Sequence, residues 1–344
     1  MFKSTLFAAV ASALLASARV MPEASDVSTH IHAGRFPLLS CTLGASQESC
    51  HSAFPIAGNS SGTCCYNGAL TPGGKESGLV LATQFYDVSV FSCSYTMEHD
   101  RTRLFTNNTS INPGPANSTT VHGIWPDYCD GTYPQFCTNV SGIPEYNGTQ
   151  IRAVLAKYDP KLLAYMEKTW TDYANPDPSD FWSHEYNKHG TCFSTLRASC
   201  QIPRRGISVE DQVVLGFFQE AVKRFKELPT LKWLAKAGIV QSDTALYNLT
   251  DVLAVLKKNY GATPHVGCAS GTNRLSEVSL TNPKCLPQMQ LLKDPLRWQF
   301  WFYANTFGPL IGAIYEPVET TFNATCPPLV SLPVKYNATA PVSP

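Results

Sequence analysis

The chain has 344 residues, of which 44% are hydrophobic, so it is long enough to bury a sizeable core in one large domain or two small ones. Lysine plus arginine and aspartate plus glutamate number 26 each, which argues against a basic protein that binds duplex nucleic acid tightly. No stretch of about 18 apolar residues predicts a membrane span.

Residues 1–18 have the features of a secretory signal peptide. Lys3 is followed by an apolar run over 6–15 and by the small residues Ala16, Ser17 and Ala18, after which cleavage is expected. The apolar run is too short to span a membrane. Residues 19–40 lack a clear period and are interpreted as a lead-in or pro-segment. The protein is therefore expected to be secreted into the medium or delivered to a vacuole.

The twelve cysteines are predicted to form disulfide bonds, because the secretory compartment is oxidising. A zinc site is the alternative, but no C-x-x-C pair occurs in the chain. N-x-S/T sequons predict a glycoprotein, and they begin at Asn59, Asn107, Asn108, Asn117, Asn139, Asn147, Asn248, Asn323 and Asn337.

Hydrophobic spacing predicts both helices and strands. A continuous apolar run predicts a buried strand over 78–86, and a helical period predicts helices over 151–170, 209–228 and 246–260, the last with polar caps within 248–251. Strand-like runs follow over 300–304 and 310–315. Because helices and strands are interspersed without a repeat, the predicted class is α+β.

Two short segments hold most of the candidate chemistry: His122-Gly-Ile-Trp-Pro-Asp127 and Phe181-Trp-Ser-His-Glu-Tyr-Asn-Lys-His-Gly-Thr-Cys192. They combine three histidines with a glutamate, a lysine and aromatic rings. When a phosphodiester is cleaved by a neighbouring hydroxyl, one group must take the proton of that hydroxyl and another must give a proton to the departing oxygen. Imidazoles suit both steps because they titrate near the working pH, and a lysine can stabilise the charge on phosphorus.

If 182–189 is helical, Glu185 and His189 share one face, as do His184 and Lys188, and the turn presents all four toward a common edge. A zinc hydrolase is the competing interpretation. In zinc peptidases the two histidines lie four residues apart on a helix, whereas His184 and His189 are five apart and point in different directions. The spacing therefore favours metal-free chemistry.

These two motifs, in this order and with flanking cysteines, resemble the active-site segments of the ribonuclease T2 family, and the likeness runs from about Cys41 to Tyr336. The resemblance implies one catalytic domain over 41–336, with a central antiparallel sheet, packed helices and stapling disulfides, followed by a tail over 337–344. It also implies a secreted endoribonuclease with weak base preference. Such an enzyme cleaves single-stranded RNA through a 2′,3′-cyclic phosphate to 3′-phosphate products and needs no metal or other cofactor.

The resemblance assigns catalytic roles position by position. His189 corresponds to the base and His122 to the acid of the first step, while Glu185 and Lys188 correspond to groups that stabilise the pentacovalent phosphorus. His184 corresponds to a phosphate-binding residue. The expected partner is single-stranded RNA, without a membrane or an obligate protein partner, and the enzyme is expected to be a monomer.

The resemblance also assigns the base-binding residues. Trp125, Asp127 and Tyr133 correspond to a first base site, in which a ring stacks and a carboxylate bonds the base edge. Phe181 corresponds to part of a second base site. Structural alternatives remain open: Trp125 and Trp182 can be core aromatics, and Glu185 can be an ion-pair partner of Lys188. The assignment requires His122 and His189 to meet across a phosphate-sized gap, with both rings within reach of solvent.

The cysteines depart from the family pattern, because fungal members usually carry ten. Cys93 and Cys285 are unmatched, and each lies in a stretch that resembles an insertion, over 88–107 and 279–299. Each stretch begins at a Val-Ser dipeptide, one possible translation of a splice-donor sequence, and we hypothesise that one or both are retained introns. By resemblance, the remaining cysteines pair as Cys41–Cys65, Cys50–Cys129, Cys64–Cys200, Cys137–Cys192 and Cys268–Cys326.

A second hypothesis from another class is a binding or toxin-like protein on a ribonuclease scaffold that no longer depends on catalysis. A retired enzyme has no reason to keep His122, Glu185, Lys188 and His189 together, and all four are present.

Overall fold

The structure is a computed structural model that describes residues 49–50, 64, 77–87, 112–172, 175–269 and 297–335, all within a compact unit over Pro37–Pro344. The expected signal peptide and lead-in, the Cys41–Cys65 pair, Cys93, Cys285 and the suspected insertion over 88–107 lie outside the described residues. Of the suspected insertion over 279–299, residues 279–296 lie outside the described residues and residues 297–299 lie within them. Residues 297–299 belong to a paired strand, so a boundary at 299 is placed too far along the chain.

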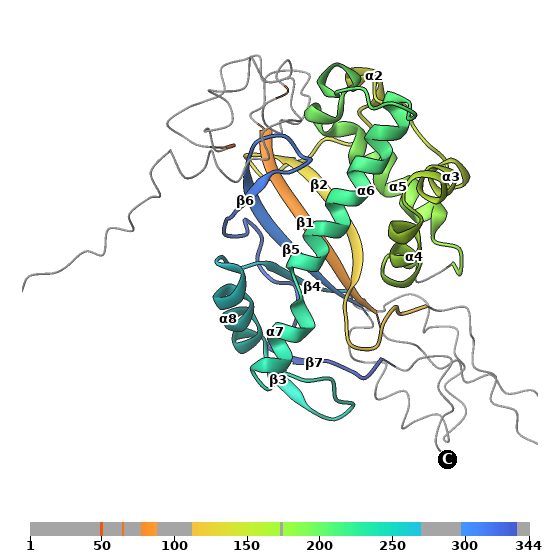
Figure 1. The fold of residues 1–344 in the computed structure, drawn as a ribbon. Helices are drawn as coiled ribbons and strands as arrows, with labels where there is room; N and C mark the ends of the chain where they lie inside the picture. Colours follow the sequence, from red (N-terminus) through yellow and green to blue (C-terminus); the bar gives the residue numbers. More distant parts are fainter. Residues whose placement is uncertain are drawn as a thin grey trace, which may run out of the picture. The chain divides into compact units, whose positions relative to one another are not determined.

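An antiparallel sheet forms the centre of the fold (Figure 1). Two long strands, β1 (Ser77–Asp87) and β5 (Arg297–Phe307), pair with each other in its middle. Beyond β1 lies β2 (Thr120–Tyr128), and β5 also pairs with β4 (His265–Ala269) and β6 (Ile314–Pro317). A separate two-stranded sheet joins β3 (Leu246–Asn248) to β7 (Leu329–Ser331).

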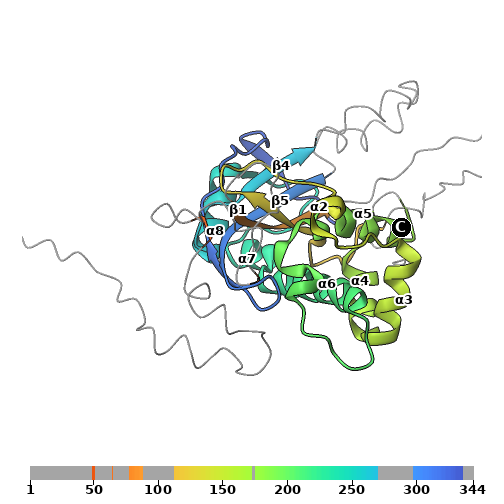
Figure 2. The same ribbon diagram turned by 90° about the horizontal axis from the view of Figure 1, so that it is seen from above.

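The helices are α2 (Thr138–Ser141), α3 (Gly148–Tyr158), α4 (Pro160–Thr169), α5 (Ser179–Lys188), α6 (Val209–Glu227), α7 (Thr230–Lys236) and α8 (Leu249–Tyr260), with short 3-10 turns at Gly190–Cys192, Ser194–Leu196 and Ala198–Cys200. In Figure 1, α6 crosses in front of the sheet, and Figure 2 shows α6 and α7 on the same side of it. No described helix is long and apolar enough to cross a membrane.

The two faces of β1 serve different purposes, because successive side chains of a strand point to opposite faces. Val80, Ala82 and Tyr86 pack among the helices. Leu79 and Leu81 point the other way, where they form a small cluster with aromatic residues of β2 and β5. Since β1 is buried on both sides, its sequence is a continuous apolar run, and the predicted strand over 78–86 is confirmed.

The predicted helix over 151–170 is wrong as one element, because the chain forms α3 and α4 with a break at Asp159. Pro160 has no N–H to donate and disfavours a helical conformation of the residue before it. Asp159 accordingly has φ −150° and ψ 73°, and its side chain accepts a hydrogen bond from Leu162 N at 3.0 Å, which begins α4. The helical spacing of apolar residues continues through both helices, because α3 and α4 pack on the same hydrophobic core.

Two further boundaries differ from the sequence prediction. The segment expected to be helical over 246–260 begins as β3, and α8 starts at Leu249 without the expected capping bond from a side chain. The strand expected over 310–315 is a strand only from Ile314, because the preceding residues turn (Ala313 N to Leu310 O, 3.2 Å). By contrast, α6 matches the predicted helix over 209–228, and β5 contains the predicted strand over 300–304.

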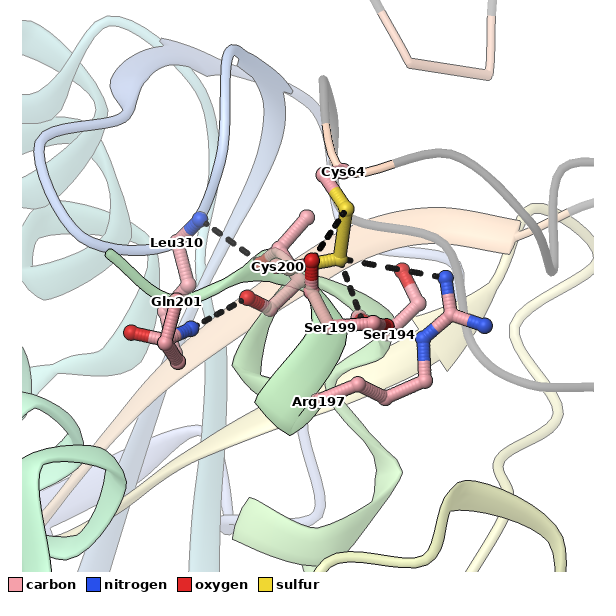
Figure 3. The surroundings of a disulfide bond; sticks show 8 residues. Cys64, Ser194, Arg197, Ser199, Cys200, Gln201 and Leu310 are labelled. Carbon is pink, nitrogen blue, oxygen red and sulfur yellow. Dashed lines mark hydrogen bonds between the residues drawn. A yellow bond between two sulfur atoms is a disulfide. The ribbon is translucent and has the colours of Figure 1, made fainter. Parts of the chain in front are cut away.

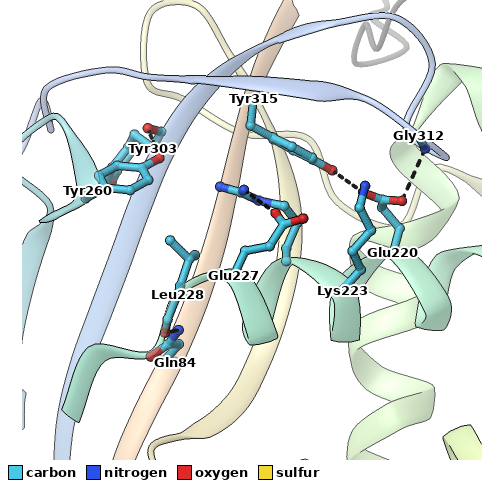
Figure 4. A network of polar contacts seen from close by, with 10 residues as sticks. Gln84, Glu220, Lys223, Glu227, Leu228, Tyr260, Tyr303, Gly312 and Tyr315 are labelled. Carbon is cyan, nitrogen blue, oxygen red and sulfur yellow. Dashed lines mark hydrogen bonds and ion pairs between the residues drawn. The ribbon is translucent and has the colours of Figure 1, made fainter. Parts of the chain in front are cut away.

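A buried carboxylate on α6 explains why this segment turns (Figure 4). Glu220 is 4% exposed and accepts hydrogen bonds from Gly312 N and from the hydroxyl of Tyr315, both at 3.2 Å. Lys223 forms an ion pair with the same carboxylate at 3.0 Å. These contacts satisfy a buried charge and fix the 310–315 segment against α6.

Four of the five predicted disulfides are present: Cys50–Cys129, Cys64–Cys200, Cys137–Cys192 and Cys268–Cys326. Figure 3 shows the second of them, where Arg197 lies against the sulfur of Cys200 and also bonds Ser194 O at 2.9 Å. Each bridge joins residues at least 55 positions apart in the sequence. The bridges therefore reduce the conformational entropy of the unfolded chain, which stabilises the fold. The expected α+β class, with a single disulfide-stapled domain, is confirmed.

Candidate active site

A β-bulge in β2 directs His122 away from the helical core. Thr83 and Gln84 are consecutive in β1, yet they pair with the two residues on either side of His122, which leaves His122 as the extra residue. A bulge of this kind turns a side chain that the regular alternation would place elsewhere. The imidazole stacks on Phe85 of β1 with 3.9 Å between ring centroids and 20° between planes.

Helix α5 supplies the other part of the site. Asp180 in its first turn and Lys188 in its last complement the helix dipole. The indole of Trp182 is fully buried and donates to Trp170 O at 2.8 Å. Trp182 is thus a core aromatic, as the structural alternative in the sequence analysis proposed. It fixes α5 against the body of the protein and sets the rotation of the helix.

Glu185 connects the two motifs. Its side chain is 1% exposed, its Oε1 lies 3.5 Å from Nε2 of His122, and its Oε2 accepts a hydrogen bond of 2.8 Å from Nε1 of Trp125. Burial by itself would raise the pKa of Glu185, but the attraction of His122 and His189 and the bond from Trp125 outweigh it and hold this pKa below its usual value. Within the described chain, the ion-pair partner of Glu185 is His122 rather than Lys188.

His189 follows the last residue of α5 and lies beneath Trp125. The two rings stack with 4.7 Å between centroids and 16° between planes. The side chain is 3% exposed, and neither ring nitrogen has a hydrogen-bond partner among the described residues. Burial lowers the pKa of His189 to about 3, so its imidazole is neutral over most of the acidic range.

The two candidate histidines therefore meet around one indole, since His122 also contacts Trp125, edge-on at 4.7 Å. This satisfies the requirement that the two motifs come together. The accessibility requirement is not satisfied in this arrangement, because both nitrogens of His189 are buried while the side chain of His122 is 15% exposed.

The four polar residues of α5 do not share one edge, contrary to the sequence analysis. Glu185 and His189 face the sheet and are buried, whereas Lys188 is half-buried and His184 is exposed. The reason is that consecutive residues differ by about 100° around a helix, so two pairs spaced by four residues form two adjacent faces. The four remain close enough for Lys188 and His184 both to lower the pKa of His189.

The expected base-binding residues have different surroundings. Tyr133 is 56% exposed, and Phe181 is half-buried with its ring 5.8 Å from that of His122. Trp125 is half-buried and holds Glu185 and His189 as described. Asp127 is only 4% exposed, and burial raises its pKa to about 8. Burial therefore favours the protonated form of Asp127, whereas the expected contact with a base edge uses its carboxylate.

Two residues of the site have no signal in the sequence that would reveal their role. Phe85 stacks on His122, but its strand reads only as a buried apolar run. Gly123 lies so close to the site that a Cβ placed there would overlap Oε2 of Glu185 and crowd Nε1 of Trp125. The described residues contain no cluster of three histidine, cysteine or carboxylate side chains arranged to hold a metal ion.

Comparison with known proteins agrees with this geometry. The model of the ribonuclease T2 family matches residues 77–292, which include both motifs. This chain belongs to the ribonuclease T2 family. That result confirms the resemblance and the predicted enzyme class.

Individual relatives cover most of the chain. Ribonuclease T2 of Aspergillus oryzae is 32% identical over 81% of this chain and 78% of its own length, and Ribonuclease Trv of Hypocrea rufa is 35% identical over 81% and 92%. Ribonuclease T2-like 1-A of Candida albicans is 32% identical over 88% of this chain, which spans only 64% of that relative. The crystal structure of Actibind, a T2 ribonuclease, matches with a TM-score of 0.58 and 32% identity, over 80% of this chain and 92% of Actibind.

Proposed function

We propose that this protein is a secreted or vacuolar endoribonuclease that cleaves single-stranded RNA by transphosphorylation, with weak base preference and without a metal. The observation that carries the proposal is the position of Glu185, which lies against His122 and bonds the indole that covers His189. Family membership and the named ribonucleases among the relatives support the same chemistry.

In the first step, neutral His189 takes the proton of the ribose 2′-hydroxyl, and the resulting oxygen attacks the adjacent phosphorus. The bond to the 5′-oxygen breaks, and His122 in its protonated form gives its proton to that leaving group. The product is a 2′,3′-cyclic phosphate. In the second step, His122 takes a proton from water, the water oxygen opens the ring, and His189 returns a proton to the 2′-oxygen, which leaves a 3′-phosphate.

The charges of the site fit these roles. Burial lowers the pKa of His189, so its imidazole is held in the neutral form that a proton acceptor needs. Glu185 is ionised and faces Nε2 of His122, which is the arrangement of an ion pair when that ring carries a proton. Lys188 and His184 supply positive charge for the phosphate and its pentacovalent state.

Access to His189 requires a movement. Because its nitrogens are buried under the stacked indole, the ribose reaches the base only when Trp125 shifts from its face. Trp125 thus has two roles in the proposal: its N–H orients Glu185, and its ring stacks on a base in the complex. Tyr133 lies exposed on the loop after β2 and can join that contact.

The proposal is tested with purified protein and single-stranded RNA oligonucleotides in the presence of a chelator, from acidic to neutral pH. We expect 2′,3′-cyclic phosphate products that convert slowly to 3′-phosphates. His122→Ala and His189→Ala are each expected to lose at least about 10²-fold in rate.

The matched control is His265→Gln, which changes a buried histidine of β4 whose ring lies against Trp301. We expect this variant to keep its rate to within a few-fold. Cleavage that is lost only in chelator would indicate a metal-dependent hydrolase, and a rate for His122→Ala or His189→Ala comparable to that of the parent would overturn the roles given to these histidines. A parent protein that does not cleave RNA with or without chelator would leave the retired-scaffold hypothesis.

A further inference from the structure

The loop between β2 and α2 is held in place at both ends. Disulfides anchor it at Cys129 and at Cys137. Near its end, Phe136 N donates to Lys188 O at 2.9 Å, and Cys137 N donates to the hydroxyl of Thr191 at 3.0 Å. The loop is therefore fixed directly to the end of α5 that carries the polar residues of the site.

Within this loop, Phe136 has an unfavourable backbone conformation. Its φ is 52°, and it is one of two non-glycine residues with positive φ in the described part of the chain. A bulky residue rarely adopts this conformation, which persists only where the surroundings impose it. Burial of the ring does not offset the strain, because the residue is 50% exposed.

The ring of Phe136 stands beside the groups expected to hold phosphate. It lies edge-to-face with His184, with 6.3 Å between ring centroids, and its backbone N–H bonds the backbone carbonyl of Lys188, which fixes the loop beside this residue. Proteins that bind single-stranded nucleic acids combine an exposed aromatic ring with positive groups that follow the backbone. The chemistry of this place therefore fits a nucleobase on the ring and its phosphate on His184 and Lys188.

We propose that Phe136 is a base-stacking residue, which binds a nucleobase of the single-stranded RNA whose phosphate contacts His184 and Lys188. It acts in addition to Trp125, Tyr133 and Phe181. The proposal rests on the proposed function, since it assigns a further contact for the same substrate. The strained backbone and the two disulfides fix the ring before the substrate arrives, which reduces the entropy lost on binding.

The test measures binding without cleavage. Parent and variant proteins are titrated with a 2′-O-methyl oligoadenylate, which cannot transphosphorylate, and with an abasic strand of the same length. We expect Phe136→Ala to weaken binding of the oligoadenylate about tenfold, because stacking contributes that much per base. Binding of the abasic strand should not change. Phe136→Trp should restore the affinity for the oligoadenylate.

Two further variants separate stacking from folding. Phe136→Gly suits the positive φ, so it should keep the melting temperature of the parent and lose affinity as Phe136→Ala does. Val140→Ala removes another exposed apolar side chain, on α2, and should change neither measurement. On cleavable RNA, Phe136→Ala should raise KM more than it lowers kcat.

The proposal is overturned if Phe136→Ala and Phe136→Gly bind the oligoadenylate to within about twofold of the parent, or if they weaken binding of the abasic strand equally. The binding titration needs no catalysis. A parent protein that does not cleave RNA would therefore refute the proposed function, whereas the titration with the oligoadenylate would still decide whether Phe136 stacks on a base.

Discussion

Replacement of Trp125 by phenylalanine tests whether this tryptophan orients the carboxylate of Glu185 for the proposed reaction. The substitution keeps an aromatic ring that can stack on His189, so the covering of that residue changes little. It removes the indole N–H, which bonds Oε2 of Glu185 at 2.8 Å. That carboxylate is 1% exposed and has no bulk water to replace the lost donor.

A hydrogen bond to a charged, buried group contributes about 1.5–3 kcal/mol, which corresponds to a loss of about 10- to 150-fold if it acts fully in the transition state. The bond also helps to hold the pKa of Glu185 below its usual value. Without it this pKa rises, so Glu185 becomes protonated at a higher pH. We therefore expect lower kcat and an acidic limb of the pH–rate profile that moves to higher pH.

The assay is steady-state cleavage of a single-stranded oligonucleotide in chelator across the acidic range, with melting temperatures measured in parallel. Trp182→Phe is the matched control. It removes an indole N–H bonded at the same distance, 2.8 Å, but to the backbone of Trp170 in the core. This control should lower the melting temperature and leave the acidic limb in place.

Three results would refute the argument about Trp125. A kcat equal to that of the parent, with an unchanged acidic limb, would show that the bond to Glu185 does not support catalysis. A higher kcat would show that the anchored indole mainly hinders access to His189. A change confined to KM would indicate base stacking alone.

Three other predictions follow from single features of the structure. Gly123→Ala should reduce kcat at least about tenfold with a smaller effect on melting temperature, because its Cβ would displace Glu185 and Trp125; activity equal to the parent's would contradict the close packing. In the parent, folded Asp127 keeps its proton up to about pH 8, whereas the unfolded chain releases it near pH 4, so the unfolding free energy of the parent falls as pH rises between these values. Asp127→Asn has no such proton, so its unfolding free energy should gain on that of the parent by at most about 1.4 kcal/mol per pH unit over this range. Melting temperatures that run parallel across this range would place the pKa of Asp127 near its ordinary value. The double variant Cys137→Ser/Cys192→Ser should lose about 4 kcal/mol of unfolding free energy in urea, because the bridge closes a 55-residue separation; an unchanged midpoint would mean that the bridge does not restrict the unfolded chain.

The sequence alone indicated the chemistry, because the required residue types stand close together within each motif. Helix periodicity placed Glu185 and His189 on one face of α5, and the structure agrees. The apolar runs over 78–86 and 209–228 predicted β1 and α6, since burial on both faces of a strand, or on one stripe of a helix, leaves a direct pattern. Boundaries failed where a local rule competed with the pattern, as at Asp159-Pro160.

Only the tertiary structure decided how the two motifs meet. The bulge at His122 depends on pairing with β1, the bond from Trp125 to Glu185 joins residues 60 positions apart, and burial in the folded protein lowers the pKa of His189. No short-range pattern encodes such contacts, because they depend on strand register and on the rotation of α5 set by packing. The same holds for Asp127 and Phe136, whose residue types were visible in the sequence, while burial of the first and exposure of the second were not.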